Sequence, residues 1–254
     1  MIDHVPLQTL VTYLNETMLY QFQWGFKKAG RTIEEWKTWA HKELKPMAVD
    51  MLKRCQQEEI LKPQAVYGYW PCASEGDSVI LFDPADQGKE LARFPFPRQS
   101  GEGGLCIADF VRDVSSGQRD VIGLQVVTMG HAASEVARQW FAENRYKDYL
   151  YLHGLGVEMT EALAEYVHAR IRSELGFAAE DSREIEQVLK QTYRGSRYSF
   201  GYPACPHLED QDKLLSLLGA DRVGITLSEE FQLEPEQSTS AIVLLHPQAK
   251  YFSV

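Results

Sequence analysis

The sequence predicts a single α+β domain in which helices flank a mainly antiparallel or mixed sheet. Helical periodicity on both sides of a central series of short β-rich runs is the first observation that favours this class. The second is that the connections between those runs are too short for crossover helices, which argues against a regular doubly wound sheet. The chain has 254 residues, of which 44% are hydrophobic, so it can bury a substantial core. No internal repeat or low-complexity linker divides it, and we expect one domain over residues 1–254.

Amphipathic helices are expected in the first sixty residues. Apolar side chains recur at spacings of three and four over residues 6–23, which predicts one helix with a core-facing stripe. A second helical stretch begins with Thr32 and Glu35 in capping-box positions and continues toward residue 55. Pro46 must bend or divide this stretch, because proline lacks an amide donor and clashes with the preceding turn.

The middle of the chain changes to short β-rich runs bounded by Gly, Pro and Asp. The expected strands cover residues 65–72, 78–82, 91–96, 105–110 and 121–129. Helical periodicity returns over residues 132–143, 157–175 and 183–192, and Asp181 with Glu184 is a plausible cap pair for the last helix. A short helix near 210–218 and strands around 223–227 and 239–245 complete the prediction.

Charge and hydropathy exclude several classes of protein. Acidic residues outnumber basic ones by 36 to 26, a formal charge of -10, so neither nucleic acid nor an anionic membrane is an expected partner. No apolar run approaches the roughly 18 to 20 residues of a spanning helix, and the first residues lack the pattern of a secretory signal. We therefore expect a cytoplasmic protein.

The cysteines and histidines do not predict a metal site. Cys55, Cys72, Cys106 and Cys205 are widely separated, so free thiols are expected. Cys205 and His207 lie close together, but they supply two ligands where a structural zinc needs four. We expect no metal held by the protein.

Two generic motifs occur in the long helical region. Gly154-Leu155-Gly156 begins like a dinucleotide-binding fingerprint, but Met159 stands where the third glycine belongs. Glu161, Glu165 and His168 are spaced to share one face of a helix. The Glu165 and His168 pair would be half of a carboxylate di-iron site, and no second half exists in the sequence. A solvated polar face or the wall of a polar pocket is therefore favoured.

The stretch from Tyr193 to Pro206, YRGSRYSFGYPACP, has an unusual composition. It holds two basic residues, three tyrosines, two glycines and two prolines. Prolines stiffen a loop, and glycines let its backbone approach a ligand closely. The Arg197 fork fits a carboxylate through two parallel hydrogen bonds, and aromatic faces can flank an adenine. The alternative is a structural loop in which Arg197 pairs with a surface acid.

The same stretch resembles a known family. Arg197 to Pro206, RYSFGYPACP, is similar to the Arg-x-x-x-Gly-Tyr-Pro-Ala-Cys-Pro signature of the activation domain of cobalamin-dependent methionine synthase, its C-terminal S-adenosylmethionine-binding module. Five further blocks resemble that family in the same order. They are YGYWPC (67–72), LCIADFV (105–111), AEYVHARIR (164–172), TLSEEFQLEPEQSTSA (226–241) and HPQAKYF (246–252).

The resemblance implies a fold and a function. The fold would be a helmet-like or C-shaped α+β domain built around a bent, mainly antiparallel sheet. The domain would bind S-adenosylmethionine and, with a flavodoxin-type reductant, restore methylcobalamin from inactive cob(II)alamin. No Asp-x-His-x-x-Gly corrinoid motif occurs in the sequence, so cobalamin would be held by a partner domain or protein. The alternatives are a non-catalytic S-adenosylmethionine sensor and a free-standing homologue that serves another corrinoid protein.

The resemblance also implies site residues. Arg197 would bind the methionyl carboxylate, Glu161 the α-amino group or an ordered water, and Tyr251 would lie near the ligand. Tyr202 would lie near the transferring methyl group and is the predicted catalytic residue. The remaining predicted ligand contacts come from the turn inside the signature, which we call the signature turn. It consists of Gly201, Tyr202, Pro203, Ala204 and Cys205, and the backbone of residues 202–205 would line the adenine.

This sequence departs from the family pattern at two positions. Asn15 stands where the family usually has an aspartate that contacts the ligand, and Gln191 stands where some members have a glutamate. Both exchanges remove a negative charge from a site for a ligand with two positive centres. We retain Asn15 as a predicted contact and expect the exchange to weaken binding by about 1 kcal/mol or more.

Overall fold

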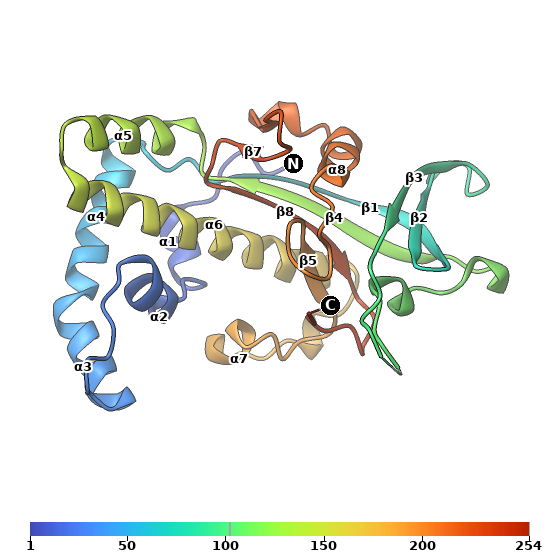
Figure 1. Cartoon of the computed structure of the whole chain (residues 1–254), viewed down its shortest axis with the longest axis horizontal. Helices are drawn as coiled ribbons and strands as arrows, with labels where there is room; N and C mark the ends of the chain where they lie inside the picture. Colours follow the sequence, from blue (N-terminus) through green and yellow to red (C-terminus); the bar gives the residue numbers. More distant parts are fainter. Residues whose placement is uncertain (102, 254) are drawn as a thin grey trace.

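The computed structural model describes residues 1–101 and 103–253, which contain a six-stranded antiparallel sheet with the strand order β3-β2-β1-β4-β8-β5. Its strands are β1 (Gln64–Glu75), β2 (Ser78–Phe82), β3 (Glu90–Pro95), β4 (Asp120–Thr128), β5 (Ser196–Ser199) and β8 (Ser238–Leu244). A separate two-stranded ladder pairs β6 (Thr226–Leu227) with β7 (Leu233–Glu234). Figure 1 shows α1 to α5 gathered at one end of the sheet and α6 running from there along it, while β2 and β3 project from the other end. The α+β class and the antiparallel sheet are confirmed.

The N-terminal region is more broken than the sequence predicts. The single helix expected over residues 6–23 is wrong, because the structure has α1 (Leu7–Val11), α2 (Glu16–Met18) and a π-helical turn, η1 (Leu19–Gln23). The break is fixed locally, since the Asn15 side chain accepts a hydrogen bond from the Met18 amide and starts α2. The division of the second stretch is confirmed as α3 (Ile33–Glu43), which carries the Thr32 and Glu35 capping box, and α4 (Lys45–Gln57).

A helix of 29 residues, α6 (Tyr146–Glu174), runs along the sheet after α5 (His131–Ala142) (Figure 1). It begins well before the residue 157 that periodicity predicts. Gly154 lies inside this helix, where a Cβ atom would stand 2.7 Å from the Gln23 Cβ atom and 3.0 Å from the Trp24 ring. Gly154 thus allows η1 to pack closely against α6, and Gly156 leaves room for the Gln237 side chain, where a Cβ atom would stand 3.0 Å from Gln237 Cγ. Close packing accounts for both glycines without a nucleotide.

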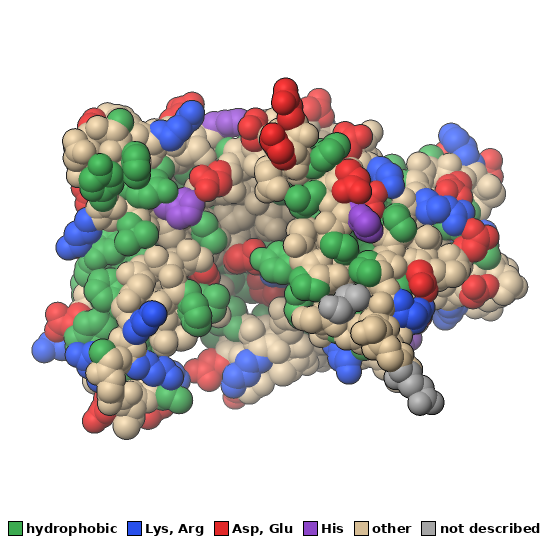
Figure 2. Space-filling view, in the orientation of Figure 1, with side chains coloured by type: hydrophobic (Ala, Val, Ile, Leu, Met, Phe, Trp, Pro, Cys, Tyr) green, Lys and Arg blue, Asp and Glu red, His purple; other side chains and the backbone are tan. Residues whose placement is uncertain are grey.

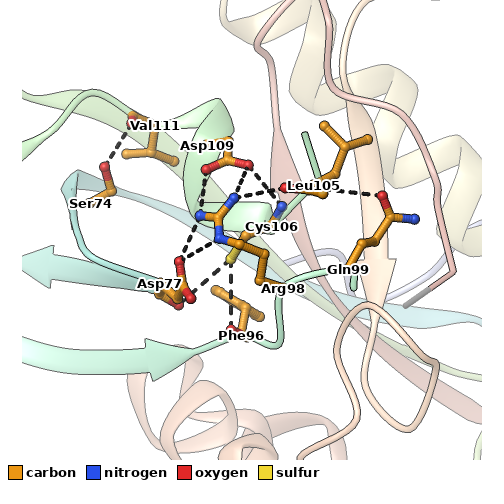
Figure 3. Close-up of polar contacts among 10 residues, drawn as sticks. Ser74, Asp77, Phe96, Arg98, Gln99, Leu105, Cys106, Asp109 and Val111 are labelled. Atoms are coloured by element: carbon orange, nitrogen blue, oxygen red, sulfur yellow. Dashed lines mark hydrogen bonds and ion pairs between the residues drawn. The ribbon is translucent and has the colours of Figure 1, made fainter. Parts of the chain in front are cut away.

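The strand predicted over residues 105–110 is wrong, because that segment forms a short 3₁₀ helix, η2 (Ile107–Phe110). Asp109 accepts a hydrogen bond from the Cys106 amide at 2.8 Å, and Arg98 clamps Asp109 and Asp77 together at 2.8 and 2.6 Å (Figure 3). The composition of the segment favours a strand, but this ion-paired clamp, made by residues distant in the sequence, fixes a turn instead.

The helix predicted over residues 183–192 shrinks to α7 (Ile185–Leu189) after a 3₁₀ turn, η4 (Ala178–Glu180). Asp181 does not cap it, because its carboxylate pairs with the Arg172 guanidinium at 2.8 Å. The helix predicted near residue 210 is confirmed as α8 (Asp210–Leu218). Two further 3₁₀ turns are η3 (Val114–Ser116) and η5 (Ala220–Val223). The strand expected around residues 223–227 is shorter than predicted, because η5 includes Val223 and only β6 (Thr226–Leu227) is extended.

The buried side chains form two main clusters. One lies between the helices α1 to α6 and the sheet, and the other contains side chains of the sheet, the signature turn, α8 and the C-terminal segment. All four cysteines, which lie in the described part of the chain, are free, as expected, and all four are buried. Among the described residues, no helix is both long and apolar enough to cross a membrane.

Candidate functional site

The site is built where β5 passes the middle of α6. Alternation along β5 buries Ser196 and Tyr198, while Arg197 and Ser199 are only partly buried. The strand itself was missed in the sequence, where it lies inside the stretch expected to be a loop. Arg197 pairs with Val243 in the ladder with β8, so the strand fixes the position of the arginine backbone.

Two carboxylates of α6 hold the Arg197 guanidinium. Its Nη1 atom donates to Glu165 Oε2 at 2.9 Å, and its Nη2 atom donates to Glu161 Oε2 at 3.2 Å. The exposed fractions of the Arg197, Glu165 and Glu161 side chains are 12%, 7% and 47%. The structure therefore brings together Arg197 and Glu161, as the resemblance implies, and pairs the arginine with one half-exposed acid and one buried acid.

Glu165 is the centre of a polar cluster that the sequence reasoning missed. Its Oε2 atom also accepts a hydrogen bond from the Tyr193 hydroxyl at 2.9 Å, and its Oε1 atom lies 3.5 Å from Arg172 Nη2. The Arg172 guanidinium stacks on the Tyr193 ring at 3.7 Å from its centroid. The sequence signal for this cluster was the helix face shared by Glu161, Glu165 and His168. Of the two interpretations of that face, the wall of a polar pocket fits Glu165, and the solvated face is wrong for it, because Glu165 is buried.

His168 continues this face and is fully buried beside the Tyr193 ring. Neither ring nitrogen has a hydrogen-bond partner among the described residues. Burial lowers the pKa of His168 well below its ordinary value, and the positive charges of Arg172 and Arg197 lower it further. The imidazole is therefore neutral and adds no charge to the cluster.

The two predicted tyrosines border the same place from different segments. Tyr202 and Tyr251 are 54% and 46% exposed. Burial of its hydroxyl raises the pKa of Tyr202, the nearby Glu161 and Tyr251 raise it further, and Arg197 opposes them. Tyr202 thus lies within electrostatic reach of the other three predicted residues, Arg197, Glu161 and Tyr251.

Tyr251 is held from both sides by its backbone neighbours. The Tyr198 hydroxyl donates to the Lys250 carbonyl at 2.8 Å, and the Gln99 amide donates to the Ser253 carbonyl. The C-terminal segment is thereby fastened to β5 and to the segment before η2.

The turn after β5 is closed by its own backbone. The Gly201 amide donates to the Cys205 carbonyl at 2.9 Å, and the Cys205 amide donates to the Tyr202 carbonyl at 2.8 Å. Gly201 has a φ of +84°, which a side chain would strain. Ala204 and Cys205 are buried, whereas Gly201, Tyr202 and Pro203 are exposed.

The amides of Tyr202 and Ala204 donate to no other residue among those described. Tyr202 is exposed, so its amide can meet a ligand that carries hydrogen-bond acceptors, such as the ring nitrogens of a purine, whereas Ala204 is buried.

Asn15 is not joined to the other predicted site residues by a hydrogen bond among the described residues. Its side-chain oxygen caps α2 through the Met18 amide at 3.1 Å. The segment is nevertheless fastened to α6, because Gln23 donates to the buried Glu158 at 3.0 Å. Gln191 is exposed and has a φ of +56° just before the cluster.

Figure 2 shows a hollow in the middle of one face, with acidic side chains at its floor, where Figure 1 places α6 and β5. A separate cavity of about 920 Å³ lies between α5, α8 and β8 and includes Phe200 of the signature, but none of the predicted site residues line it. We assign the site to the place where β5 and α6 meet, and not to this cavity, because the ion pair of Arg197 with Glu161 lies there.

The arrangement suits a small ligand that carries both charges. Arg197 matches a carboxylate, Glu161 matches a cationic group, and the exposed tyrosine rings offer flat surfaces. Among residues 1–101 and 103–253, no group of three or more His, Cys, Asp or Glu side chains has the geometry to hold a metal ion.

Comparisons with known proteins agree on one family. A family model described as "Vitamin B12 dependent methionine synthase, activation domain" matches residues 6–254. The methionine synthases of Mycobacterium tuberculosis (strain ATCC 25618 / H37Rv) and Mycobacterium leprae (strain TN) are 47% and 44% identical, each aligned to 95% of this chain. The chain spans only 21% of the length of these relatives.

A solved structure is also similar over the whole chain. It is described as "Crystal Structure of the MetH Reactivation Domain bound to AdoHcy" and matches with a TM-score of 0.88 and 26% sequence identity. The match covers 100% of this chain and 80% of that one.

Proposed function

The chain belongs to the family of activation domains of vitamin B12 dependent methionine synthases, and from this premise we propose that it binds S-adenosylmethionine and supports the reductive methylation of inactive cob(II)alamin. The observation that carries the proposal is the ion pair of Arg197 with Glu161 on α6, with the exposed Tyr202 and Tyr251 near it. A related reactivation domain is described as bound to AdoHcy, the demethylated form of this ligand.

The residues present fit the amino-acid end of the ligand. Arg197 would bind the α-carboxylate, because a guanidinium fork matches a carboxylate in charge and geometry. Glu161, half-exposed and next to the fork, would bind the α-ammonium group. When bound, S-adenosylmethionine would supply the methyl group from its sulfonium centre.

The signature turn fits the nucleoside end. The Tyr202 amide, which has no backbone partner among the described residues, would donate to the adenine, with the rest of the turn from Gly201 to Cys205 as backbone wall. Tyr202 would border the reacting methyl group, and Tyr251 would cover the ligand from the C-terminal segment.

Cobalamin would be held by a partner domain or protein, and a flavodoxin-type protein would supply the electron. The exposed hollow is compatible with this, because the methyl donor has to meet a cobalt centre carried by another module. The whole reaction of a methionine synthase would belong to a longer protein or an assembly, of which this chain is one part.

Calorimetric titration of S-adenosylmethionine, followed by an assay of cob(II)alamin methylation, tests the proposal. The assay mixes the protein with a cobalamin-loaded domain and a reductant. We expect saturable binding and S-adenosylmethionine-dependent formation of methylcobalamin. Binding without methylation would favour a non-catalytic sensor, and the absence of binding heat at high micromolar ligand would overturn the proposal.

A further inference from the structure

The two carboxylates that hold Arg197 are not equivalent. Glu165 is 7% exposed and has three partners, namely Arg197, Tyr193 and Arg172. Glu161 is 47% exposed, and among the described residues it forms an ion pair with Arg197 alone. One partner of the fork is therefore built into the core, while the other is a single ion pair at the surface of the hollow.

This asymmetry decides which partner a ligand can replace. Displacement of Glu165 would strand a buried carboxylate and leave the Tyr193 hydroxyl without its acceptor, which is strongly unfavourable. Displacement of Glu161 would break one ion pair between a buried guanidinium and a solvated carboxylate, which costs far less. An incoming carboxylate would therefore meet the Nη2 side of the fork.

We propose that Glu165 is the positioning residue that fixes the Arg197 fork, and that Glu161 is the exchangeable partner that a ligand carboxylate replaces. This inference rests on the proposed function, since it concerns the same site. Once displaced, the Glu161 carboxylate lies next to the ligand and is free to pair with an ammonium group. The exchange thus favours tight binding of a ligand that carries both the carboxylate and the ammonium group of an α-amino acid.

The chemical consequence is a ranking of ligands. S-adenosylmethionine has the carboxylate and the ammonium group, decarboxylated S-adenosylmethionine has only the ammonium group, and 5′-methylthioadenosine has neither. We expect the wild-type protein to bind the first at least about tenfold more tightly than either of the others, because only the first can complete the exchange.

The test measures these three affinities by calorimetry in the wild-type protein, Glu165→Gln, Arg197→Ala and the double variant. Glu165→Gln should weaken S-adenosylmethionine binding about tenfold or more, and should leave the affinity for 5′-methylthioadenosine within about twofold of the wild-type value. In the Arg197→Ala background, the effect of Glu165→Gln should vanish, because a residue that acts through the arginine has nothing left to position.

Glu174→Gln is the matched control. Glu174 lies on the same helix and also accepts hydrogen bonds from two tyrosine hydroxyls and one arginine, namely Tyr67, Tyr69 and Arg170. It is nine residues from Glu165, about 13 Å along the helix axis. Loss of an acid with similar partners, but away from the site, should leave all three affinities unchanged.

Tyr193→Phe gives an independent readout if Glu165→Gln fails to fold. It removes only the hydroxyl that donates to Glu165, and it should weaken S-adenosylmethionine binding about two- to fivefold with no effect on 5′-methylthioadenosine. Equal losses for both ligands, or unchanged S-adenosylmethionine affinity in both variants, would overturn the positioning role. If the wild-type protein itself does not bind S-adenosylmethionine, the proposed function fails instead.

Discussion

Arg197 and Glu165 join strand β5 to helix α6 through a hydrogen bond of 2.9 Å between Nη1 and Oε2, and both side chains are largely buried. An ion pair in this position is costly to desolvate, so it needs further hydrogen bonds to be tolerated. Tyr193 and Glu161 supply them. The pair therefore links the stability of the site to its capacity to bind a ligand.

Arg197→Ala should affect both properties. It should weaken S-adenosylmethionine binding by about 1.5 to 3 kcal/mol, the range for a hydrogen bond to a charged group, and should destabilise the fold by about 1 to 3 kcal/mol because Glu165 loses its main partner. Calorimetry and urea denaturation measure the two effects. Near-wild-type affinity would show that the arginine is only structural.

Asn15→Asp should tighten S-adenosylmethionine binding by about 1 kcal/mol, since it restores a negative charge facing a cationic ligand. It should not destabilise the protein, because aspartate caps a helix as well as asparagine does and suits the positive end of the helix. The measurement is calorimetry at constant pH. An unchanged affinity would mean that this helix does not face the ligand.

Glu158→Gln should change how stability depends on pH. Burial raises the pKa of Glu158 to about 7 from an ordinary value of 4.5. Between these values the folded state binds more protons than the unfolded state, so this group lowers stability as pH rises from about 4.5 to 7, after which its effect is constant.

The glutamine variant lacks this penalty and keeps an oxygen that can accept the Gln23 hydrogen bond. Relative to wild type it should therefore gain about 1 to 3 kcal/mol at pH 8 and little at pH 4.5. Urea denaturation at the two pH values gives the difference. An equal change at both would show that the carboxyl titrates normally.

Gly154→Ala should destabilise the protein by about 1 to 3 kcal/mol, although alanine is the better helix former. The new Cβ atom would stand 2.7 Å from the Gln23 Cβ atom and would push η1 away from α6. Gly156→Ala is the comparison and should cost less, because its Cβ atom would stand farther from its nearest neighbour, 3.0 Å from Gln237 Cγ. Equal effects in urea denaturation would argue against the close packing.

The regular elements were largely predictable because their patterns are local. The strand over residues 78–82 and the helix over 210–218 match the structure, since periodicity and turn residues define them. The segment 105–110 was not predictable, because Arg98, Asp77 and Asp109 decide its conformation through contacts with residues distant in the sequence. Strand β5 was hidden by the loop-like composition of the signature.

Four of the predicted site residues are brought together, namely Arg197, Glu161, Tyr202 and Tyr251. The roles of Glu165 and Tyr193 could not be predicted, because they depend on which face of α6 meets β5. Periodicity indicates that Glu161, Glu165 and His168 share a face, but only the packing shows that Glu165 is buried under the arginine.

A crystal structure of the protein with S-adenosylmethionine is the most direct test of the central claim. The ligand carboxylate is expected on Arg197 Nη2, with Glu161 displaced toward the ligand ammonium group, Glu165 unmoved and the adenine against the turn from Gly201 to Cys205. A ligand seated in the cavity beside α5 and α8, or a hollow in which Glu161 still holds Arg197, would contradict the account.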